Sequence, residues 1–191
     1  MRVITGTAKG KRLVTPEGRD VTRPTGEKVK EGIFSSIQFL IEEADVLDLF
    51  AGSGQLGIEA LSRGARSCVF VDSAKVAQKC IAENIKNCGF EDVAKLKTGD
   101  ALMYLSSAFE RFDIAFLDPP YAAEQLPVVL PALSKFMREG GIVLCETAKT
   151  SIFRKKPENL LKQRNTATEA PKCLCINAAR IDLYEKSSLP G

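Results

Sequence analysis

From Asp45 to Glu146 the chain alternates short apolar runs with longer amphipathic runs, and this alternation constrains the fold more than any other feature of the sequence. Short apolar runs bounded by turn residues are typical of buried strands, whereas apolar residues spaced by three or four indicate helices. The expected strands are 46–50, 67–71, 93–98, 112–117 and 142–146, and the expected helices are 55–63, 74–88, 101–109 and 126–138. This order predicts a doubly wound α/β fold, in which helices cover both faces of a parallel sheet.

The residues before Asp45 predict a small extension of that fold. Residues 2–5 and 11–14 flank a turn rich in glycine and lysine, which indicates a short, basic and exposed hairpin. Residues 26–43 predict a helix that Thr25 can cap. The apolar face of this helix would consist of Val29, Ile33, Phe34, Ile37, Leu40 and Ile41.

The residues after Glu146 follow a less regular pattern. Residues 153–161 predict a short helix, and the alternating residues 173–184 predict one long final strand. With 191 residues, of which 45% are hydrophobic, the chain can bury one good core. We therefore expect an extension of residues 1–43, an α/β domain of residues 44–186 and a tail of residues 187–191.

The composition excludes several kinds of chemistry. The chain has no histidine, which rules out zinc sites of mixed Cys/His type, Ser-His-Asp triads and histidine bases. Its six cysteines include no Cys-x-x-Cys pair and are expected to be reduced thiols. No apolar run approaches the roughly 18–20 residues that span a bilayer, and the first residues lack the apolar core of a signal peptide. We expect a cytoplasmic, monomeric protein without metal or membrane contact.

The charge is unevenly distributed along the chain, although the net charge is only +3. Residues 1–30 carry a net charge of +5, residues 31–148 carry −7, and residues 149–172 carry +5 again. An acidic body between two basic segments suggests a polyanionic partner that is held at the edges. The alternative is that the basic segments are solvated loops.

Residues 48–57 join the first expected strand to its helix and contain Gly52, Gly54 and Gly57. Backbone amides of such a loop and of the following helix N-terminus face a ligand above the sheet. The spacing matches the G-x-G-x-x-G loop of nicotinamide dehydrogenases, so a dinucleotide must be considered. However, Asp48 would repel a diphosphate, whereas it would pair with a cationic ammonium group. This favours a cofactor that carries an amino acid, namely S-adenosylmethionine.

Such a cofactor would extend across the ends of the first three strands. Its methionine part would lie near Asp48, its ribose on Asp72, and its adenine beside Asp100 and Ala101. Asp72 and Asp100 can instead cap the helices that follow them, and for Asp100 both roles can coexist. The expected cofactor contacts in this part of the chain are Asp48, Phe50, Ala51, Gly52, Ser53, Gly54, Asp72, Ser73, Asp100 and Ala101.

The expected strand 112–117 ends in Asp118, Pro119, Pro120 and Tyr121, which indicate a catalytic corner. The amino group of a base is a poor nucleophile. If the Asp118 carboxylate and the Pro119 carbonyl accept its two N–H bonds, they orient the amine and direct its lone pair at the sulfonium methyl. The prolines fix the loop, and Tyr121 offers a stacking face for the base or, alternatively, merely covers the loop. An unpaired base in an RNA loop reaches such a pocket at the lowest cost.

Taken in chain order, these residues resemble the class I methyltransferases that act on amino groups, and more closely the bacterial RsmD family. The segments that carry the closer resemblance are 2–6, 10–13, 22–25, 29–31, 48–54 and 61–65. RsmD enzymes methylate N2 of one guanine in 16S ribosomal RNA. The resemblance therefore implies a guanine-N2 methyltransferase that uses S-adenosylmethionine and acts on the guanine conventionally numbered 966.

The resemblance also has structural implications. It implies a Rossmann-like, seven-stranded and mostly parallel sheet whose last strand runs antiparallel. Arg23, Pro24 and Thr25 would help to close the cofactor site, so Arg23 and Thr25 join the expected cofactor contacts. The basic hairpin would meet RNA, and the partner would be 16S ribosomal RNA or an assembled or assembling small ribosomal subunit.

Three alternatives remain open from the sequence. The first keeps methyl transfer but acts on adenine N6 in DNA, which also uses an Asp-Pro-Pro-Tyr corner. The short chain, without an evident target-recognition domain, and the Arg23-Pro24-Thr25 segment stand against it. The second is a nicotinamide dehydrogenase, which gives no role to Asp48 or to the two prolines. The third is a non-catalytic RNA-binding module or assembly factor.

Overall fold

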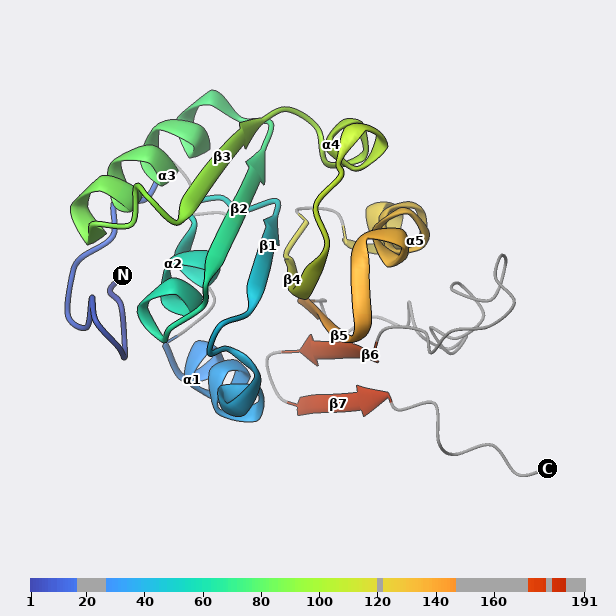
Figure 1. Ribbon diagram of the computed structural model, residues 1–191, viewed down its shortest axis with the longest axis horizontal. Coiled ribbons are helices and arrows are strands. Elements are labelled where there is room, and N and C mark those ends of the chain that lie inside the picture. The colour runs from blue at the N-terminus through green and yellow to red at the C-terminus, as the bar shows by residue number, and fades with distance from the viewer. Residues whose placement is uncertain (17–26, 120–121, 147–171, 178–179, 185–191) are drawn as a thin grey trace.

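The computed structural model describes residues 1–16, 27–119, 122–146, 172–177 and 180–184. Their strands form one sheet in the order β3-β2-β1-β4-β5-β6-β7 (Figure 1). The bounds are β1 (Asp45–Leu49), β2 (Ser67–Asp72), β3 (Ala94–Thr98), β4 (Phe112–Leu117), β5 (Met137–Glu146), β6 (Lys172–Asn177) and β7 (Arg180–Tyr184). Neighbouring strands from β3 across to β6 pair in parallel, and β7 pairs antiparallel with β6. The predicted parallel α/β sheet is therefore confirmed.

Two helical layers enclose the central strands, with a separate hydrophobic core on each side of the sheet (Figure 1). One core involves α1 (Glu27–Ser36), α2 (Gln55–Ser62) and α3 (Lys75–Cys88), and the other involves α4 (Ala101–Ser107) and α5 (Ala122–Leu133). Successive side chains of β1 enter the two cores in turn, because strand side chains alternate between faces. Burial on both faces explains why the central strands are almost continuously apolar.

The strand β3 forms one edge of the sheet. Its side chains at Lys95 and Lys97 are exposed, whereas Ala94 and Leu96 pack against the core around α2 and α3. The helix before it ends as predicted, because Gly89 adopts a left-handed conformation with φ 78° and its amide bonds to the carbonyl of Ile85.

The helix predicted over residues 26–43 is shorter than expected. It ends at Ser36, a 3-10 turn follows at Gln38–Leu40, and Leu40 is 49% exposed and does not belong to the core. The chain must reverse here to enter β1. Glu43 makes that reversal with a positive φ of 58°, which a continuing helix cannot accommodate, and its amide bonds to the carbonyl of Gly64. The proposed cap Thr25 lies outside the described residues.

The boundary between α5 and β5 also differs from the prediction. The helix begins at Ala122 rather than Leu126 and ends at Leu133, and β5 begins at Met137 rather than Ile142. Phe112 of β4 pairs with Met137 but Ile114 pairs with Ile142, so a bulge absorbs the extra residues of β5. Bulges of this kind belong to strand pairing and leave little trace in apolar periodicity.

The tail was predicted as one strand over residues 173–184, and this was wrong. Two strands, β6 and β7, form an antiparallel pair in which Asn177 is opposite Arg180. A continuous alternating pattern does not reveal such a reversal, because both strands keep a period of two. The helix predicted at residues 153–161 lies outside the described residues.

The N-terminal hairpin is present but is not exposed throughout. Arg2 and Arg12 form an antiparallel bridge, and the amide of Val3 bonds to the carbonyl of Lys11 at 3.0 Å. The hairpin carries four exposed basic residues, Arg2, Lys9, Lys11 and Arg12, and Lys11 also donates from its ammonium group to the carbonyl of Asn87 in α3 at 2.7 Å. The hairpin also packs into the core beside α1 and α2 through Val3, Ala8 and Leu13. The hairpin is thus part of the folded body and carries exposed basic residues.

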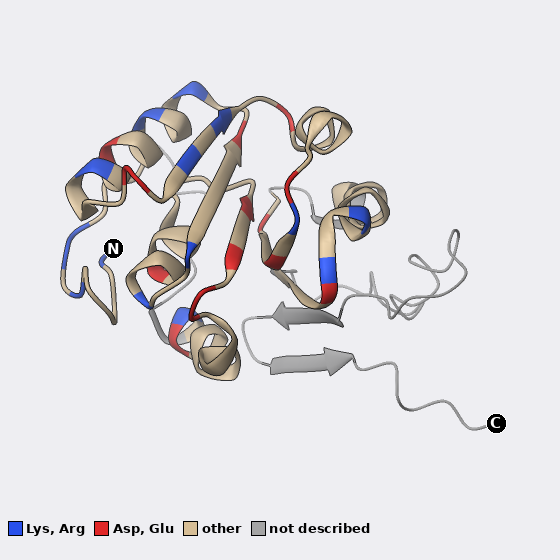
Figure 2. Ribbon diagram, viewed as in Figure 1, with Lys and Arg blue, Asp and Glu red and all other residues tan. Residues whose placement is uncertain are grey.

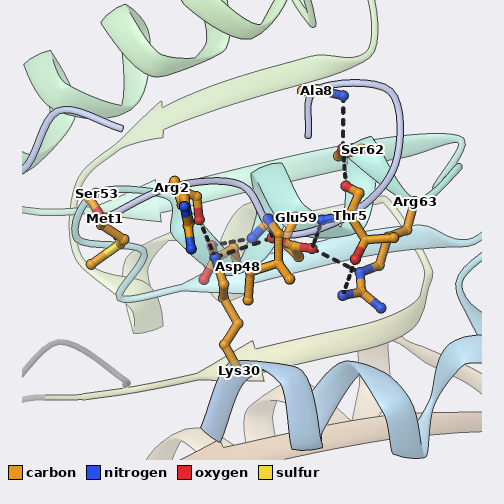
Figure 3. A network of polar contacts seen from close by, with 12 residues as sticks. Met1, Arg2, Thr5, Ala8, Lys30, Asp48, Ser53, Glu59, Ser62 and Arg63 are labelled. Atoms are coloured by element: carbon orange, nitrogen blue, oxygen red, sulfur yellow. Dashed lines mark hydrogen bonds and ion pairs between the residues drawn. The ribbon is translucent and has the colours of Figure 1, made fainter. Parts of the chain in front are cut away.

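A buried carboxylate fastens this hairpin to α2 (Figure 3). Glu59, which is fully buried, accepts hydrogen bonds from the amides of Ile4 at 2.8 Å and Thr5 at 3.0 Å. It also pairs with Lys30 of α1 at 3.1 Å and with Arg63 at 2.9 Å. A buried charge is tolerated only when it is paired and hydrogen-bonded, as it is here. The network therefore fixes the hairpin, α1 and α2 as one unit.

Ion pairs tie the sheet together at the amino ends of its strands. Asp45 of β1 accepts from Arg66, Ser67 and Arg138, and Asp113 of β4 accepts from Arg138 and from the Asp45 amide. These hydrogen bonds, led by that of Arg66, hold the pKa of Asp45 well below its usual range. These ion pairs occupy the amino ends of the strands, whereas the carboxyl ends lie at the other end of the sheet.

Several classes of site can be checked in the described part of the chain. Cys68, Cys80, Cys88 and Cys145 are buried thiols that form no disulfide, which fits the expected reduced state. No helix in the described ranges is long and apolar enough to cross a membrane. The same ranges contain no group of three or more Cys, Asp or Glu side chains arranged to hold a metal ion.

The close approach of α2 to β2 generates the first prediction. A Cβ atom at Gly57 would lie 2.3 Å from the ring of Phe70 and 2.6 Å from the sulfur of Cys68. We expect Gly57→Ala to lower the free energy of unfolding by about 1–3 kcal/mol through overpacking, as measured by urea denaturation.

Gly89→Ala is the control, because a Cβ atom at Gly89 would meet nothing within 4 Å and only the positive φ opposes the change. Adding Phe70→Leu should recover part of the loss in Gly57→Ala and none in Gly89→Ala. Strict additivity of Gly57→Ala and Phe70→Leu would show that the close approach does not limit this position.

Candidate active site

The parallel register brings the carboxyl ends of three strands, β1, β2 and β4, to one end of the sheet. Leu49 of β1 is opposite Val71 of β2 and Leu117 of β4. The next residue, Phe50, is therefore level with Asp72 on one side and Asp118 on the other. Carboxyl ends of parallel strands are where ligands bind in open α/β sheets. Phe50, Asp72 and Asp118, which are far apart in the chain, thus lie side by side at the carboxyl ends of their strands.

The glycine loop follows Phe50 and has an unusual backbone. Gly52 and Gly54 have φ values of 59° and 74°, and Phe50 has a φ of 62°, which is strained for a bulky residue. Such strain costs of order 1–3 kcal/mol and gathers at functional sites. The loop is held by hydrogen bonds from the Ala51 amide to Val71 at 3.1 Å and from the Gly54 amide to Ala51 at 2.7 Å.

Asp48 of β1 lies beneath this loop, and its side chain contacts the first turn of α2. It is 3% exposed, and one of its carboxylate oxygens accepts a hydrogen bond from the Gly57 amide at 2.9 Å. Burial, together with the negative charges of Asp118 and Asp72, raises the pKa of Asp48 to about 8, although the hydrogen bond from Gly57 opposes this rise. The ionised form is thus destabilised in the free protein, and a cation nearby would relieve this.

Asp72 supports the glycine loop, a role that the sequence did not reveal. One carboxylate oxygen accepts from the Gly52 amide and the other from the Ala74 amide, both at 2.8 Å. The second of these bonds reaches the amide of Ala74, which is itself the N-cap residue of α3, and no side chain caps this helix, so the helix-cap alternative for Asp72 is wrong. Each oxygen keeps a lone pair that can accept from a hydroxyl group. Ser73, also predicted as a cofactor contact, is exposed beside it.

Asp100 caps α4, as the alternative interpretation had it. Its side chain accepts from the amides of Leu102 at 2.8 Å and Met103 at 3.3 Å. Leu102 and Met103 are 39% and 64% exposed, which leaves apolar surface beside an acceptor at the end of β3. Ala101, the other residue predicted here, is buried in the core around α4 and α5.

The corner after β4 is described in part. Asp118 is exposed and Pro119 is buried. Pro120 and Tyr121 lie outside the described residues, as do Arg23 and Thr25. The effect of Asp118 on the pKa of Asp48 shows that the corner and the glycine loop share one electrostatic environment.

Two further residues near the site were missed by the sequence analysis. Asn84 of α3 is fully buried and donates to the carbonyl of Ser53 in the glycine loop at 2.9 Å. Gln55, the first residue of α2, has a buried Oε1 atom without a hydrogen-bond partner among the described residues. A polar residue on the buried face of a helix was the available signal at Asn84, since buried amides are normally hydrogen-bonded.

Comparison with known proteins places this geometry in a family. The family described as "Conserved hypothetical protein 95" matches residues 1–176. YlbH of Bacillus subtilis is 41% identical over 151 residues, covering 76% of this chain and 82% of that protein. Ribosomal RNA small subunit methyltransferase D of Haemophilus influenzae is 33% identical over 175 residues, covering 87% of this chain and 89% of that protein.

A solved structure agrees with the sequence relatives. The yhhF structure from Escherichia coli superimposes with a TM-score of 0.69 and 27% identity, covering 76% of this chain and 80% of that chain. The glycine loop and the carboxylates at the strand ends thus lie on a class I methyltransferase-like fold. The chain belongs to the conserved hypothetical protein 95 family, the RsmD family of S-adenosylmethionine-dependent rRNA methyltransferases.

Proposed function

We propose that this protein methylates the exocyclic N2 of a guanine in 16S ribosomal RNA, at the position conventionally numbered 966. The observation that carries the proposal is the gathering of Asp48, Asp72 and Asp118 at one end of the sheet around a strained glycine loop. This end favours a cationic ligand with hydroxyl groups, and S-adenosylmethionine has both a positive charge and ribose hydroxyls. Membership in a methyltransferase family decides against a nicotinamide dehydrogenase.

The described residues fit such a cofactor in several respects. The buried carboxyl of Asp48 would receive its ammonium group, and Asp72, with lone pairs left on both oxygens, would accept from the ribose. Asp100 and the exposed apolar surface of Leu102 and Met103 would receive the adenine. The buried acceptor of Gln55 offers a further partner for a donor on the ligand. Phe50, Ala51, Ser53 and Gly54 would line the methionine part, as the sequence predicts.

The catalytic step requires an activated amine. Bound S-adenosylmethionine would supply an electrophilic methyl group on a sulfonium. The Asp118 carboxylate and the Pro119 carbonyl would accept the two N–H bonds of guanine N2 and so direct its lone pair at the methyl carbon. The nitrogen–carbon bond would form as the sulfur–carbon bond breaks, S-adenosylhomocysteine would leave, and the proton lost from the nitrogen would pass to the Asp118 carboxylate or to water. Tyr121 would stack on the base.

The substrate assignment is supported by the relatives and by charge. The Haemophilus influenzae relative is named for the small ribosomal subunit. The hairpin carries the exposed basic residues Arg2, Lys9, Lys11 and Arg12, which suit RNA phosphates, and Figure 2 shows the positions of Lys and Arg along the chain in blue. Residues 1–43 would thus face RNA, and residues 44–186 would form the catalytic domain. The small subunit or its assembly intermediate would be the partner, which places the reaction in the cytoplasm.

Replacing Asp118 tests the catalytic corner. Asp118→Ala should lower methyl transfer to small ribosomal subunits by about 10²–10³-fold, because one acceptor for the reacting amine is lost. S-adenosylhomocysteine binding, followed by calorimetry, should stay close to that of the wild type. Asp118→Asn, which keeps an acceptor oxygen, should retain more activity than Asp118→Ala.

Asp92→Ala is the matched control. Asp92 is exposed and lies just before the amino end of β3, whereas Asp118 follows the carboxyl end of β4. Its activity should equal that of the wild type. Near-normal turnover in Asp118→Ala would contradict the proposed chemistry. Methylated adenine in DNA, or a different methylated nucleoside in ribosomal RNA, would contradict the proposed substrate. It would not contradict the proposed role of Asp118.

The raised pKa of Asp48 predicts how cofactor affinity depends on pH. With a pKa of about 8, the carboxyl is mostly protonated at pH 7 in the free protein, and pairing with an ammonium requires it to ionise. Binding therefore releases a proton below about pH 8, and the affinity for S-adenosylhomocysteine should rise from pH 6 to pH 8 by up to about tenfold per unit.

Asp48→Asn should remove this dependence and bind more weakly at pH 8. The measurement is calorimetry in buffers of different ionisation enthalpy, which reports the released proton directly. If Asp48→Asn keeps the slope of the wild type, another group titrates and Asp48 does not pair with the ligand.

A further inference from the structure

Asn84 joins three segments that are far apart in the sequence. Its Oδ1 accepts from the amide of Val14 at 2.7 Å, and its Nδ2 donates to the carbonyl of Val14 at 2.8 Å. The same Nδ2 donates to the carbonyl of Ser53 in the glycine loop at 2.9 Å. The Asn84 side chain thus exchanges two hydrogen bonds with the backbone of Val14 in the N-terminal extension. It also makes one hydrogen bond with the glycine loop.

The bond to Ser53 fixes the orientation of one peptide group of the loop. The carbonyl of Ser53 bonds to Asn84, and the amide on the same peptide plane, that of Gly54, bonds to Ala51 at 2.7 Å. Because a peptide group is planar, two such bonds hold it against rotation. Gly54 has a positive φ of 74°, so this peptide would otherwise have considerable freedom.

The β2–α3 unit therefore holds the loop at two neighbouring points. Asp72, at the end of β2, holds the amide of Gly52, and Asn84, within α3, holds the carbonyl of Ser53. Asp72 is proposed to accept from the ribose of the ligand. Asn84, in contrast, is fully buried behind the loop. Its contacts are to backbone atoms only, so it can act on a ligand only through the loop.

We infer that Asn84 is a positioning residue that keeps the glycine loop in its ligand-binding conformation and couples it to the N-terminal extension. The inference rests on the proposed function in that the loop binds S-adenosylmethionine. It gives the extension a second task besides contact with RNA, because displacement of Val14 is transmitted to Ser53 through one side chain. Loops held in their bound conformation bind more tightly, because less conformational freedom is lost on binding.

The test compares Asn84→Ala with Ser62→Ala. Ser62 holds the tip of the same hairpin, accepting from the Ala8 amide at 3.0 Å and donating to the Thr5 carbonyl at 2.5 Å, and it makes no contact with the glycine loop in the described structure. Both changes should lower the melting temperature, because each leaves buried backbone groups without partners. Asn84→Ala should weaken S-adenosylhomocysteine binding by about tenfold or more, and Ser62→Ala by less than about twofold.

A near-isosteric variant guards against a failure to fold. Asn84→Asp keeps an acceptor for the Val14 amide but loses both donors, so it should weaken cofactor binding at least as much as Asn84→Ala. In methyl transfer, both Asn84 variants should raise the KM for the cofactor and keep kcat within about threefold at saturation. Asn87→Ala, an exposed change on the same helix, should match the wild type in every measurement.

The outcomes separate this inference from the proposed function. Equal losses of affinity in Asn84→Ala and Ser62→Ala, or a fall in kcat with an unchanged cofactor KM, would overturn the positioning role. Wild-type protein that binds S-adenosylhomocysteine but methylates no guanine would overturn the substrate and leave the positioning role intact. Wild-type protein that binds no S-adenosylhomocysteine would overturn both.

Discussion

The hydrogen bond from the Gly57 amide to Asp48 joins β1, a buried strand of the sheet, to α2, the helix that follows the glycine loop. It forms only because α2 lies close to the sheet, where a glycine at position 57 leaves room for Phe70 and Cys68. This contact sets the height of the loop above the strand ends. The packing of α2 on β1 also buries Asp48, and this burial raises the pKa of the carboxyl, although the hydrogen bond from Gly57 itself lowers it. The shape of the site and its charge state therefore follow from one close approach between helix and strand.

The features that the sequence predicted well depend on neighbours in the chain. The strand over residues 112–117 has the predicted bounds, Gly89 ends α3, and Asp100 caps α4. Apolar runs, left-handed glycines and side-chain caps are local devices, so their patterns survive in a single sequence. The doubly wound architecture follows from the order of such elements rather than from any one contact. The parallel register in turn brings Asp72 and Asp118 to the sides of Phe50.

The features that escaped prediction depend on residues far apart in the chain. Glu59 and Lys30 read as ordinary polar positions, yet both are buried because the hairpin covers them. The early end of α1 and the early start of β5 reflect where the chain must turn and how β4 is paired. Asp72 was expected to bind a ribose or to cap the following helix, and neither expectation included its bond to the Gly52 amide. Tertiary contacts of this kind override local preference and leave no periodic signal.

The edge strand β3 has a consequence for how copies of the protein meet. An unpaired strand edge offers free backbone donors and acceptors to any other strand. Here the exposed positions along that edge carry Lys95 and Lys97. Two such edges brought together would place like charges opposite or diagonal to one another, which opposes pairing. The two lysines thus oppose edge-to-edge pairing of two copies through β3, although the backbone of this strand is open on that side.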